Sequence, residues 1–194
     1  MQPKPLTDID SRVLKEDYFN YDLIARSWND EYRGRVWKNK ERIADFEGTD
    51  LDEIMVELRG IVDAILHEKR RERGKRKTGI PELAEAIAGF EPKLSRPQKM
   101  MLSVHCKAPG QRVMMRAMTR LGDYASAELA FADYVQVARR LSDELAYAPA
   151  SRRKDVYAGS ALLFSDEIVV GSVGPDTVLT LRPEVAKAIE TLKW

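Results

Sequence analysis

The chain has 194 residues, with 32 lysines and arginines against 31 aspartates and glutamates, one cysteine and an apolar fraction of 44%. This length and apolar content support a buried core, which excludes a disordered tail or a fibre. The lone Cys106 excludes an internal disulfide, and no apolar run approaches the roughly 18 residues that a membrane span needs. Since the N-terminus is also too polar for a signal peptide, the sequence predicts a cytoplasmic protein without a membrane partner.

The first third of the chain is predicted to be helical. The spacing of Leu14, Tyr18 and Tyr21 is compatible with a helix, and Gly34 is expected to interrupt anything longer. A second helix is expected from Leu51 to Arg71, because its apolar residues recur at intervals of three, four and seven.

Cations alternate with aromatic rings between residues 26 and 42. The simplest interpretation is that the rings fill a small core. Two alternatives remain open: a surface that stacks unpaired bases, and a protein-recognition surface, because Trp, Tyr and Arg dominate both kinds of contact. The acidic Asp30, Glu31 and Glu41 count against the stacking of bases. The alternating residues are Arg26, Trp28, Tyr32, Arg33, Arg35, Trp37, Lys38, Lys40 and Arg42.

The strongest local charge signal follows the second predicted helix. Residues 1–66 carry 10 basic and 15 acidic side chains, whereas residues 67–79 carry 7 basic and 2 acidic ones. Such a block attracts polyanions, so it predicts salt-sensitive contact with DNA. The alternative is a solvated linker that complements the C-terminal dipole of the preceding helix. The basic residues of this block are Lys69, Arg70, Arg71, Arg73, Lys75, Arg76 and Lys77.

The rest of the chain is expected to be helical with a small β element. Helices are expected over Pro81–Gly89 and Gln98–Lys107, and a closing helix begins at Pro183. A change to β-rich runs is expected before that closing helix. These runs are Ala161–Phe164, Glu167–Val173 and Thr177–Leu181.

The stretches RVMMRAMTRLGDYASAELAFADYVQVARRLSDELAY and ALLFSDEIVVGSVGPDTVLTL combine three helical segments with a hairpin. They resemble the winged helix-turn-helix class of DNA-binding domains over residues 108–182. The resemblance implies helices over Arg112–Leu121 and Ser126–Asp133, a recognition helix over Val135–Tyr147, and a wing over Glu167–Leu181.

The resemblance makes Arg112, Gln136, Arg139 and Arg140 candidate DNA contacts. Arginine pairs with guanine edges and with phosphates, which is the basis of this prediction. The alternative is a solvated helix face on which Arg140 and Glu144 form an i,i+4 ion pair. As a wing, the hairpin over Glu167–Leu181 would contact the phosphate backbone. The alternative is that the hairpin only closes the core.

Signatures of an enzyme are sparse. His67 and His105 are the only histidines, and His105 with Cys106 provides neither four metal ligands nor the geometry of a Cys–His nucleophile pair. Glycine-rich phosphate loops are missing as well. The sequence therefore predicts no catalytic residue, no metal and no cofactor.

The expected fold is mainly α with a small β-hairpin or three-strand element. A helical region over residues 1–73, for self-association or partner contact, joins a winged-helix-like domain over 80–194 through a basic linker at 74–79. The leading hypothesis is a non-enzymatic DNA-binding regulator of transcription. The alternative is a protein-interaction or inhibitory adaptor with no nucleic-acid role, because a fold does not fix a function.

Overall fold

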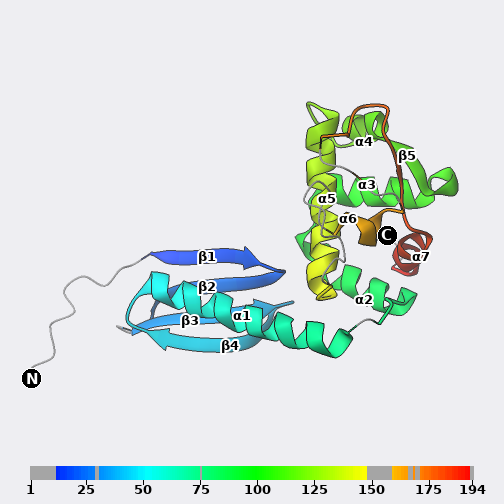
Figure 1. Cartoon of the computed structure of the whole chain (residues 1–194). Coiled ribbons are helices and arrows are strands. Elements are labelled where there is room, and N and C mark those ends of the chain that lie inside the picture. Colours follow the sequence, from blue (N-terminus) through cyan, green and yellow to red (C-terminus); the bar gives the residue numbers. More distant parts are fainter. Residues whose placement is uncertain are drawn as a thin grey trace, which may run out of the picture. The chain divides into compact units, whose positions relative to one another are not determined.

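A computed structural model describes residues 12–28, 31–74, 76–147, 159–165, 168 and 171–192 (Figure 1). The chain forms two compact units, Met1–Glu72 and Arg73–Trp194. Each unit is described by itself below.

The first unit opens with a four-stranded antiparallel sheet in the order β1-β2-β3-β4. The two-residue turns Phe19-Asn20 and Asn39-Lys40 have positive φ at both positions, as type I′ hairpin turns require. Such turns match the twist of the strands that they join. The strands are β1 (Val13–Tyr18), β2 (Tyr21–Trp28), β3 (Glu31–Lys38) and β4 (Glu41–Gly48).

The prediction of a helical N-terminal region is therefore wrong, and the fold class is mixed α and β. Tyr18 and Tyr21 lie on two different strands, on either side of a tight turn. The buried residues of β2 are Tyr21, Leu23 and Ala25, which recur at intervals of two. This period directs one face of the strand toward a core and the other away from it.

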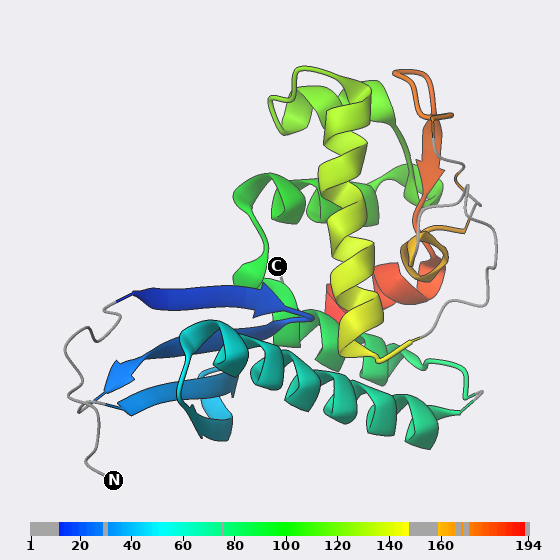
Figure 2. The same ribbon diagram turned by 60° about the vertical axis from the view of Figure 1, so that its left-hand side comes forward.

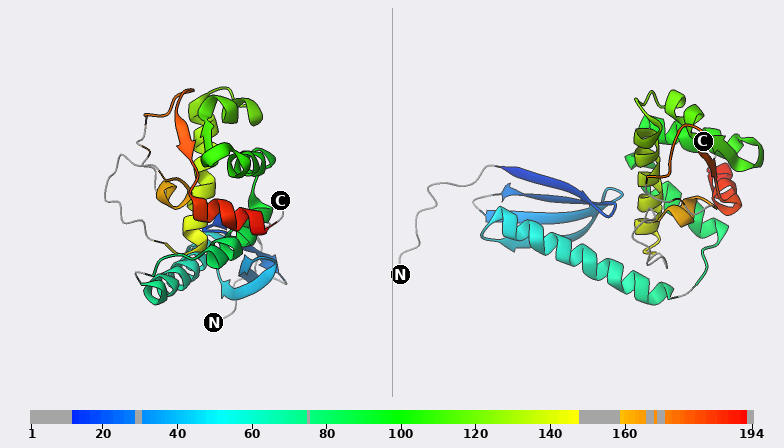
Figure 3. Two further views of the ribbon diagram at one scale, coloured as in Figure 1. Left: turned by 90° about the vertical axis from the view of Figure 1, so that its right-hand side faces the viewer. Right: turned by 45° about the horizontal axis from the view of Figure 1, so that its top comes forward.

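Helix α1 (Leu51–Arg73) lies along one face of the sheet (Figure 1; Figure 3, right), and the helix predicted over this segment is confirmed. Asp50 begins it, because its Oδ1 accepts hydrogen bonds from the backbone N–H of Asp52 (2.8 Å) and Glu53 (3.0 Å). Its apolar stripe packs on the sheet. The fully buried residues of that stripe are Leu51, Ile54, Leu58, Val62 and Leu66.

Gly34 on β3 permits this close packing. A Cβ at Gly34 would lie 2.3 Å from Cγ2 of Ile54 and 3.0 Å from Cδ1 of Leu58. Glycine in a strand often marks such a close approach. The sequence predicts that Gly34 interrupts a helix. In the structure Gly34 instead lets α1 and the sheet approach each other closely.

The second unit is helical with a two-stranded sheet. Figure 2 shows its longest helix, α5, which packs against α2, α3, α4 and α6. The elements are α2 (Ile80–Phe90), η1 (Glu91–Lys93), α3 (Arg96–Lys107), η2 (Pro109–Gln111), β5 (Arg112–Met114), α4 (Met115–Leu121), α5 (Ala127–Glu144), α6 (Ser160–Leu163), β6 (Val178–Thr180) and α7 (Pro183–Thr191).

Several predictions for this unit need correction. The helices expected over Ser126–Asp133 and Val135–Tyr147 are one continuous helix, α5, which Ser126 caps through the backbone N–H of Leu129. Residues 112–114 form a strand instead of the start of a helix. The run 161–164 is mostly helix α6 because Gly159, with a positive φ, starts a helical turn there.

The predicted wing over Glu167–Leu181 is also not a hairpin of the expected kind. Strand β6 pairs with β5, and Leu181 forms a single bridge with Phe164. Residues 166, 167, 169 and 170 lie outside the described residues. The structure is thus not a helical region followed by a winged domain. The helices predicted over 98–107 and from Pro183 are confirmed.

Candidate nucleic-acid interface

The face of the sheet that points away from α1 is called the open face here. No helix among the described residues of the first unit covers it. Strand alternation places cationic, aromatic and aliphatic side chains on β1, β2 and β3 there. They surround a hollow of about 330 Å³, called the cationic hollow, which is lined by Val13, Lys15, Ile24, Arg26, Trp28, Arg33, Arg35 and Trp37.

Trp28 is the most exposed ring of this hollow, at 42% of its full surface. The guanidinium carbon of Arg26 lies 4.5 Å from the centre of a Trp28 ring, and that of Arg35 lies 5.8 Å from it. Both distances are in the range of cation–π attraction. The sequence pattern of cations and rings therefore forms a surface, and the simple interpretation that the rings fill a core does not hold for Trp28.

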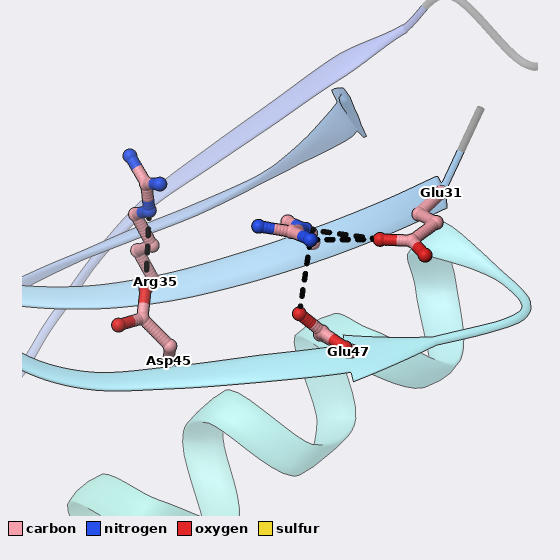
Figure 4. Close-up of polar contacts among 5 residues, drawn as sticks. Glu31, Arg35, Asp45 and Glu47 are labelled. Atoms are coloured by element: carbon pink, nitrogen blue, oxygen red, sulfur yellow. Dashed lines mark hydrogen bonds and ion pairs between the residues drawn. The ribbon is translucent and has the colours of Figure 1, made fainter. Parts of the chain in front are cut away.

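Carboxylates hold two of the arginines in place (Figure 4). Arg33 Nη2 lies 2.8 Å from Glu31 Oε2 and 3.2 Å from Glu47 Oε1. Arg35 Nε donates to Asp45 Oδ1 at 3.1 Å. The hydrogen bond that Arg33 donates to Glu31, together with the charge of Glu47, raises the pKa of Arg33, so its charge is fixed.

The register explains why these groups meet. Arg33 pairs with Glu47 and Arg35 with Asp45 across β3 and β4, so each arginine faces a carboxylate on the next strand. The lining of the cationic hollow itself holds four cations and no carboxylate. The acidic groups thus border the hollow along β4 and at Glu31, while its interior suits an anion next to a planar ring.

Three lining residues were not among the sequence candidates. They are Val13 and Lys15 on β1 and Ile24 on β2. The signal that identifies them is the alternation Tyr21, Leu23, Ala25, which directs Ile24 and its cross-strand neighbour Lys15 to the open face.

The residues of the basic block, 69–77, have different surroundings. Lys69 Nζ donates to the hydroxyl of Tyr21 at 3.3 Å, and Arg71 pairs with Glu68 at 2.5 Å. Arg70 is exposed, as is Lys77. Lys75 lies outside the described residues.

Arg73 and Arg76 come together on one carboxylate. Both pair with Glu82 of α2, and Arg73 Nε also donates to the carbonyl of Leu145 at 2.7 Å. The Arg73 side chain is only 8% exposed. Its contacts give Arg73 a structural role inside the second unit.

The residues predicted from the helix-turn-helix resemblance lie on two elements. Arg112 is exposed on β5, whereas Gln136, Arg139 and Arg140 belong to α5. Arg139 is exposed, and nine of the 18 residues of α5 are buried. From residue 135 onward its buried residues are Val135, Val137, Ala138, Leu141 and Ser142. The helix is amphipathic, and Gln136, Arg139 and Arg140 are not among its buried residues, so they remain predicted DNA contacts.

His105 and Tyr134 form a buried polar pair in the second unit. His105 Nδ1 lies 2.9 Å from the Tyr134 hydroxyl, and Nε2 lies 3.0 Å from the carbonyl oxygen of Leu179. Because a carbonyl only accepts, Nε2 carries the proton and Nδ1 accepts from Tyr134. Burial lowers the pKa of His105, which favours the neutral ring. The neighbouring Cys106 is buried, as predicted.

Comparisons with protein-family models, curated proteins and solved structures found no match. Among the described residues there is no group of three or more metal-ligating side chains. No helix within the described ranges is long and apolar enough to cross a membrane.

Proposed function

We propose that the chain is a non-enzymatic nucleic-acid-binding protein and that the open face of its sheet binds a single strand. The observation that carries the proposal is Trp28, an exposed ring flanked by Arg26 and Arg35 in the cationic hollow. Proteins that bind single strands combine a cationic groove for the backbone with aromatic side chains on which bases stack.

The same features favour a single strand over a duplex. A duplex hides the faces of its bases, so an exposed indole on a sheet gains nothing from it, whereas unpaired bases can stack. Lys15 and Arg26 then provide charges for the phosphates, and Trp28 and Trp37 provide the rings.

The bordering carboxylates set the expected strength of binding. Glu31, Asp45 and Glu47 already occupy Arg33 and Arg35, so a phosphate competes with them for the guanidinium groups. Binding is accordingly expected to be moderate and to weaken with salt, because the phosphate contacts release counterions. A cytoplasmic DNA-binding regulator remains the wider role that we propose for the protein.

The second candidate is a protein-recognition surface. The observation in its favour is the mixture of charges around the open face together with two exposed aliphatic residues, Val13 at 50% and Ile43 at 41%. Interfaces between proteins use arginine and tryptophan as anchors in the same way. This candidate predicts no affinity for nucleic acid.

A fluorescence-anisotropy titration separates the two candidates. A labelled single strand and the duplex of the same sequence are titrated at about 50 and about 200 mM salt. We expect the single strand to bind more tightly and to lose affinity with salt.

The variant Arg26→Gln/Arg35→Gln should weaken this binding, while Lys187→Gln, an exposed lysine of α7, should not. Absence of single-strand binding at the lower salt concentration would overturn the proposal and favour the protein-recognition surface.

A further inference from the structure

The four cations of the cationic hollow occupy adjacent positions on the open face. Arg26 on β2 lies directly opposite Arg33 on β3. One step along the sheet, Ile24 on β2 lies between Lys15 on β1 and Arg35 on β3. Like charges directly opposite each other destabilise a sheet, so an anion between Arg26 and Arg33 offsets a repulsion that the fold itself creates.

Arg26 has the least compensated charge of the four. The bordering carboxylates pair with Arg33 and Arg35 (Figure 4). Arg26 faces Val13 on one side and Arg33 on the other, so no carboxylate lies directly opposite it. Its guanidinium carbon lies instead 4.5 Å from the centre of a Trp28 ring. An anion at Arg26 therefore displaces no ion pair, whereas an anion at Arg33 or Arg35 competes with one.

Lys15 is the second cation available to the same anion. It is a diagonal neighbour of Arg26, whose direct partner on β1 is Val13. Diagonal neighbours in an antiparallel pair lie about 7–8 Å apart, which is within reach of long side chains. Asp17 and Asp22 follow Lys15 toward the hairpin turn and reduce its attraction for anions, so Arg26 is the stronger anchor of the two.

The phosphates of a nucleic-acid strand differ in charge. An internal phosphodiester carries one negative charge. A terminal phosphomonoester has a second pKa near 6, so it carries a charge of about −1.5 to −2 at pH 7 and offers three strong acceptor oxygens. Arginine pairs with such oxygens through two parallel hydrogen bonds. A cluster of neighbouring cations therefore attracts a terminal phosphate more strongly than an internal one.

From this juxtaposition we propose that the cationic hollow holds a terminal phosphate of the bound strand. Arg26 and Lys15 bind the phosphate, and the exposed ring of Trp28 contacts the base of the same nucleotide. The volume of about 330 Å³ lies at the lower end of the range for small-ligand sites, which suits one terminal nucleotide. The inference rests on the proposed single-strand function and names the part of the strand that the same site prefers.

Oligo(dC) strands of one length test the inference in anisotropy titrations with the full chain. One strand carries a 5′-phosphate, one a 3′-phosphate and one neither, and an internal label leaves both ends free. We expect one phosphorylated strand to bind at least about fivefold more tightly than the unphosphorylated strand, because one more unit charge about 4 Å from a cation contributes about 1 kcal/mol even in water. The preferred strand shows which end the hollow holds.

Two controls separate a specific site from a general effect of charge. An unphosphorylated oligo(dC) two nucleotides longer has about the same total charge as a phosphorylated strand, and it should bind less tightly than the preferred one. Arg26→Gln should bring the preference for the terminal phosphate close to one. Lys187→Gln, which removes one positive charge from an exposed position of α7, should keep the full preference.

The outcomes distinguish the inference from the function on which it rests. Equal affinity for all strands of one length, or a preference no larger than that for the longer control, overturns the inference and leaves single-strand binding intact. Failure to bind any of the strands overturns the proposed function itself. Lys15→Gln is the second variant in case Arg26→Gln does not fold, and an unchanged preference in either folded variant overturns the inference.

Discussion

The guanidinium carbon of Arg26 lies 4.5 Å from the centre of a ring of Trp28, on the face of the sheet that α1 leaves uncovered. Arg35 approaches the same ring from the neighbouring strand, at 5.8 Å. Two charges thus lie beside the indole while Trp28 remains 42% exposed. A ligand that is both planar and anionic gains from the ring and from the charges at once, which is the reason to expect nucleic acid.

Replacement of Trp28 by alanine should weaken single-strand binding by about 1–3 kcal/mol, the usual contribution of one stacked base. Trp28→Phe should retain much of this energy, because phenylalanine keeps a ring face. The exposed position of Trp28 predicts little change in thermal stability for either variant. Anisotropy titrations and thermal melts check both statements. Equal affinities of the alanine and phenylalanine variants would show that the ring does not stack a base.

Removal of a bordering carboxylate should have the opposite effect. Glu47 holds Arg33 at 3.2 Å on the surface, where an ion pair contributes only about 0–1 kcal/mol to stability. Glu47→Gln should therefore raise the affinity for a single strand modestly without unfolding the sheet, because a phosphate then competes for Arg33 with Glu31 alone. The same titration measures this gain. A lower affinity in Glu47→Gln would contradict the proposed competition.

The close approach at Gly34 predicts a strong effect of a single methyl group. Gly34→Ala places a Cβ within 2.3 Å of Ile54 Cγ2, so the helix or the strand must move. We expect a loss of about 1–3 kcal/mol in the free energy of unfolding, as for other overpacked cores. Gly60→Ala is the matched control, because Gly60 lies on α1 with no atom within 4 Å of the added Cβ.

The control should gain about 0.5–1 kcal/mol from the better helix propensity of alanine. Urea unfolding of the two variants gives both numbers. If Gly34→Ala were as stable as wild type, α1 would not pack closely on β3 at this position.

The sequence predicts the helices of this fold much better than its sheet. Helix α1 follows from the regular spacing of large apolar residues such as Ile54, Leu58 and Val62. The sheet has no comparable signal, because its buried positions include the small residues Ala25 and Gly34.

The hairpin turns also escape prediction. Phe19-Asn20 and Asn39-Lys40 adopt the positive φ of a type I′ turn without the glycine that usually announces one. The sequence shows the alternation of cations and rings in the candidate site, but their common face depends on the register of β1, β2 and β3. Lys15 joins the site only through that register.

The buried His105 predicts a pH dependence of stability. Burial lowers its pKa in the folded chain, so below about pH 6.5 the unfolded chain binds a proton that the folded chain does not. The stabilisation is present above this pH and is lost as the pH falls toward the lowered pKa of the folded state. The slope in that window is up to about 1.4 kcal/mol per pH unit.

Urea unfolding at about pH 7.5 and about pH 5.5 measures this loss. His105→Gln should reduce the difference between the two pH values, whereas His67→Gln, at an exposed position of α1, should keep it. Identical differences in all three proteins would show that His105 is not responsible.

Helix α5 provides a test of the alternative DNA contact. Leu141 is fully buried, so Leu141→Ala should cost about 2–5 kcal/mol of stability. Arg139→Ala/Arg140→Ala should cost no more than about 1 kcal/mol and should leave single-strand binding unchanged. Thermal melts and anisotropy titrations compare the two variants. A large loss of binding in the arginine variant would move the interface from the sheet to α5.

The central claim is that the open face of the first unit is the binding surface, and nuclear magnetic resonance tests it most directly. Backbone amide and indole N–H signals of the ¹⁵N-labelled chain are followed during titration with oligo(dC). We predict shifts of the indole signals of Trp28 and Trp37 and of the amides of β1, β2 and β3, with the signals of α5 unchanged. Shifts confined to the second unit, or to the basic block from Lys69 to Lys77, would contradict the account.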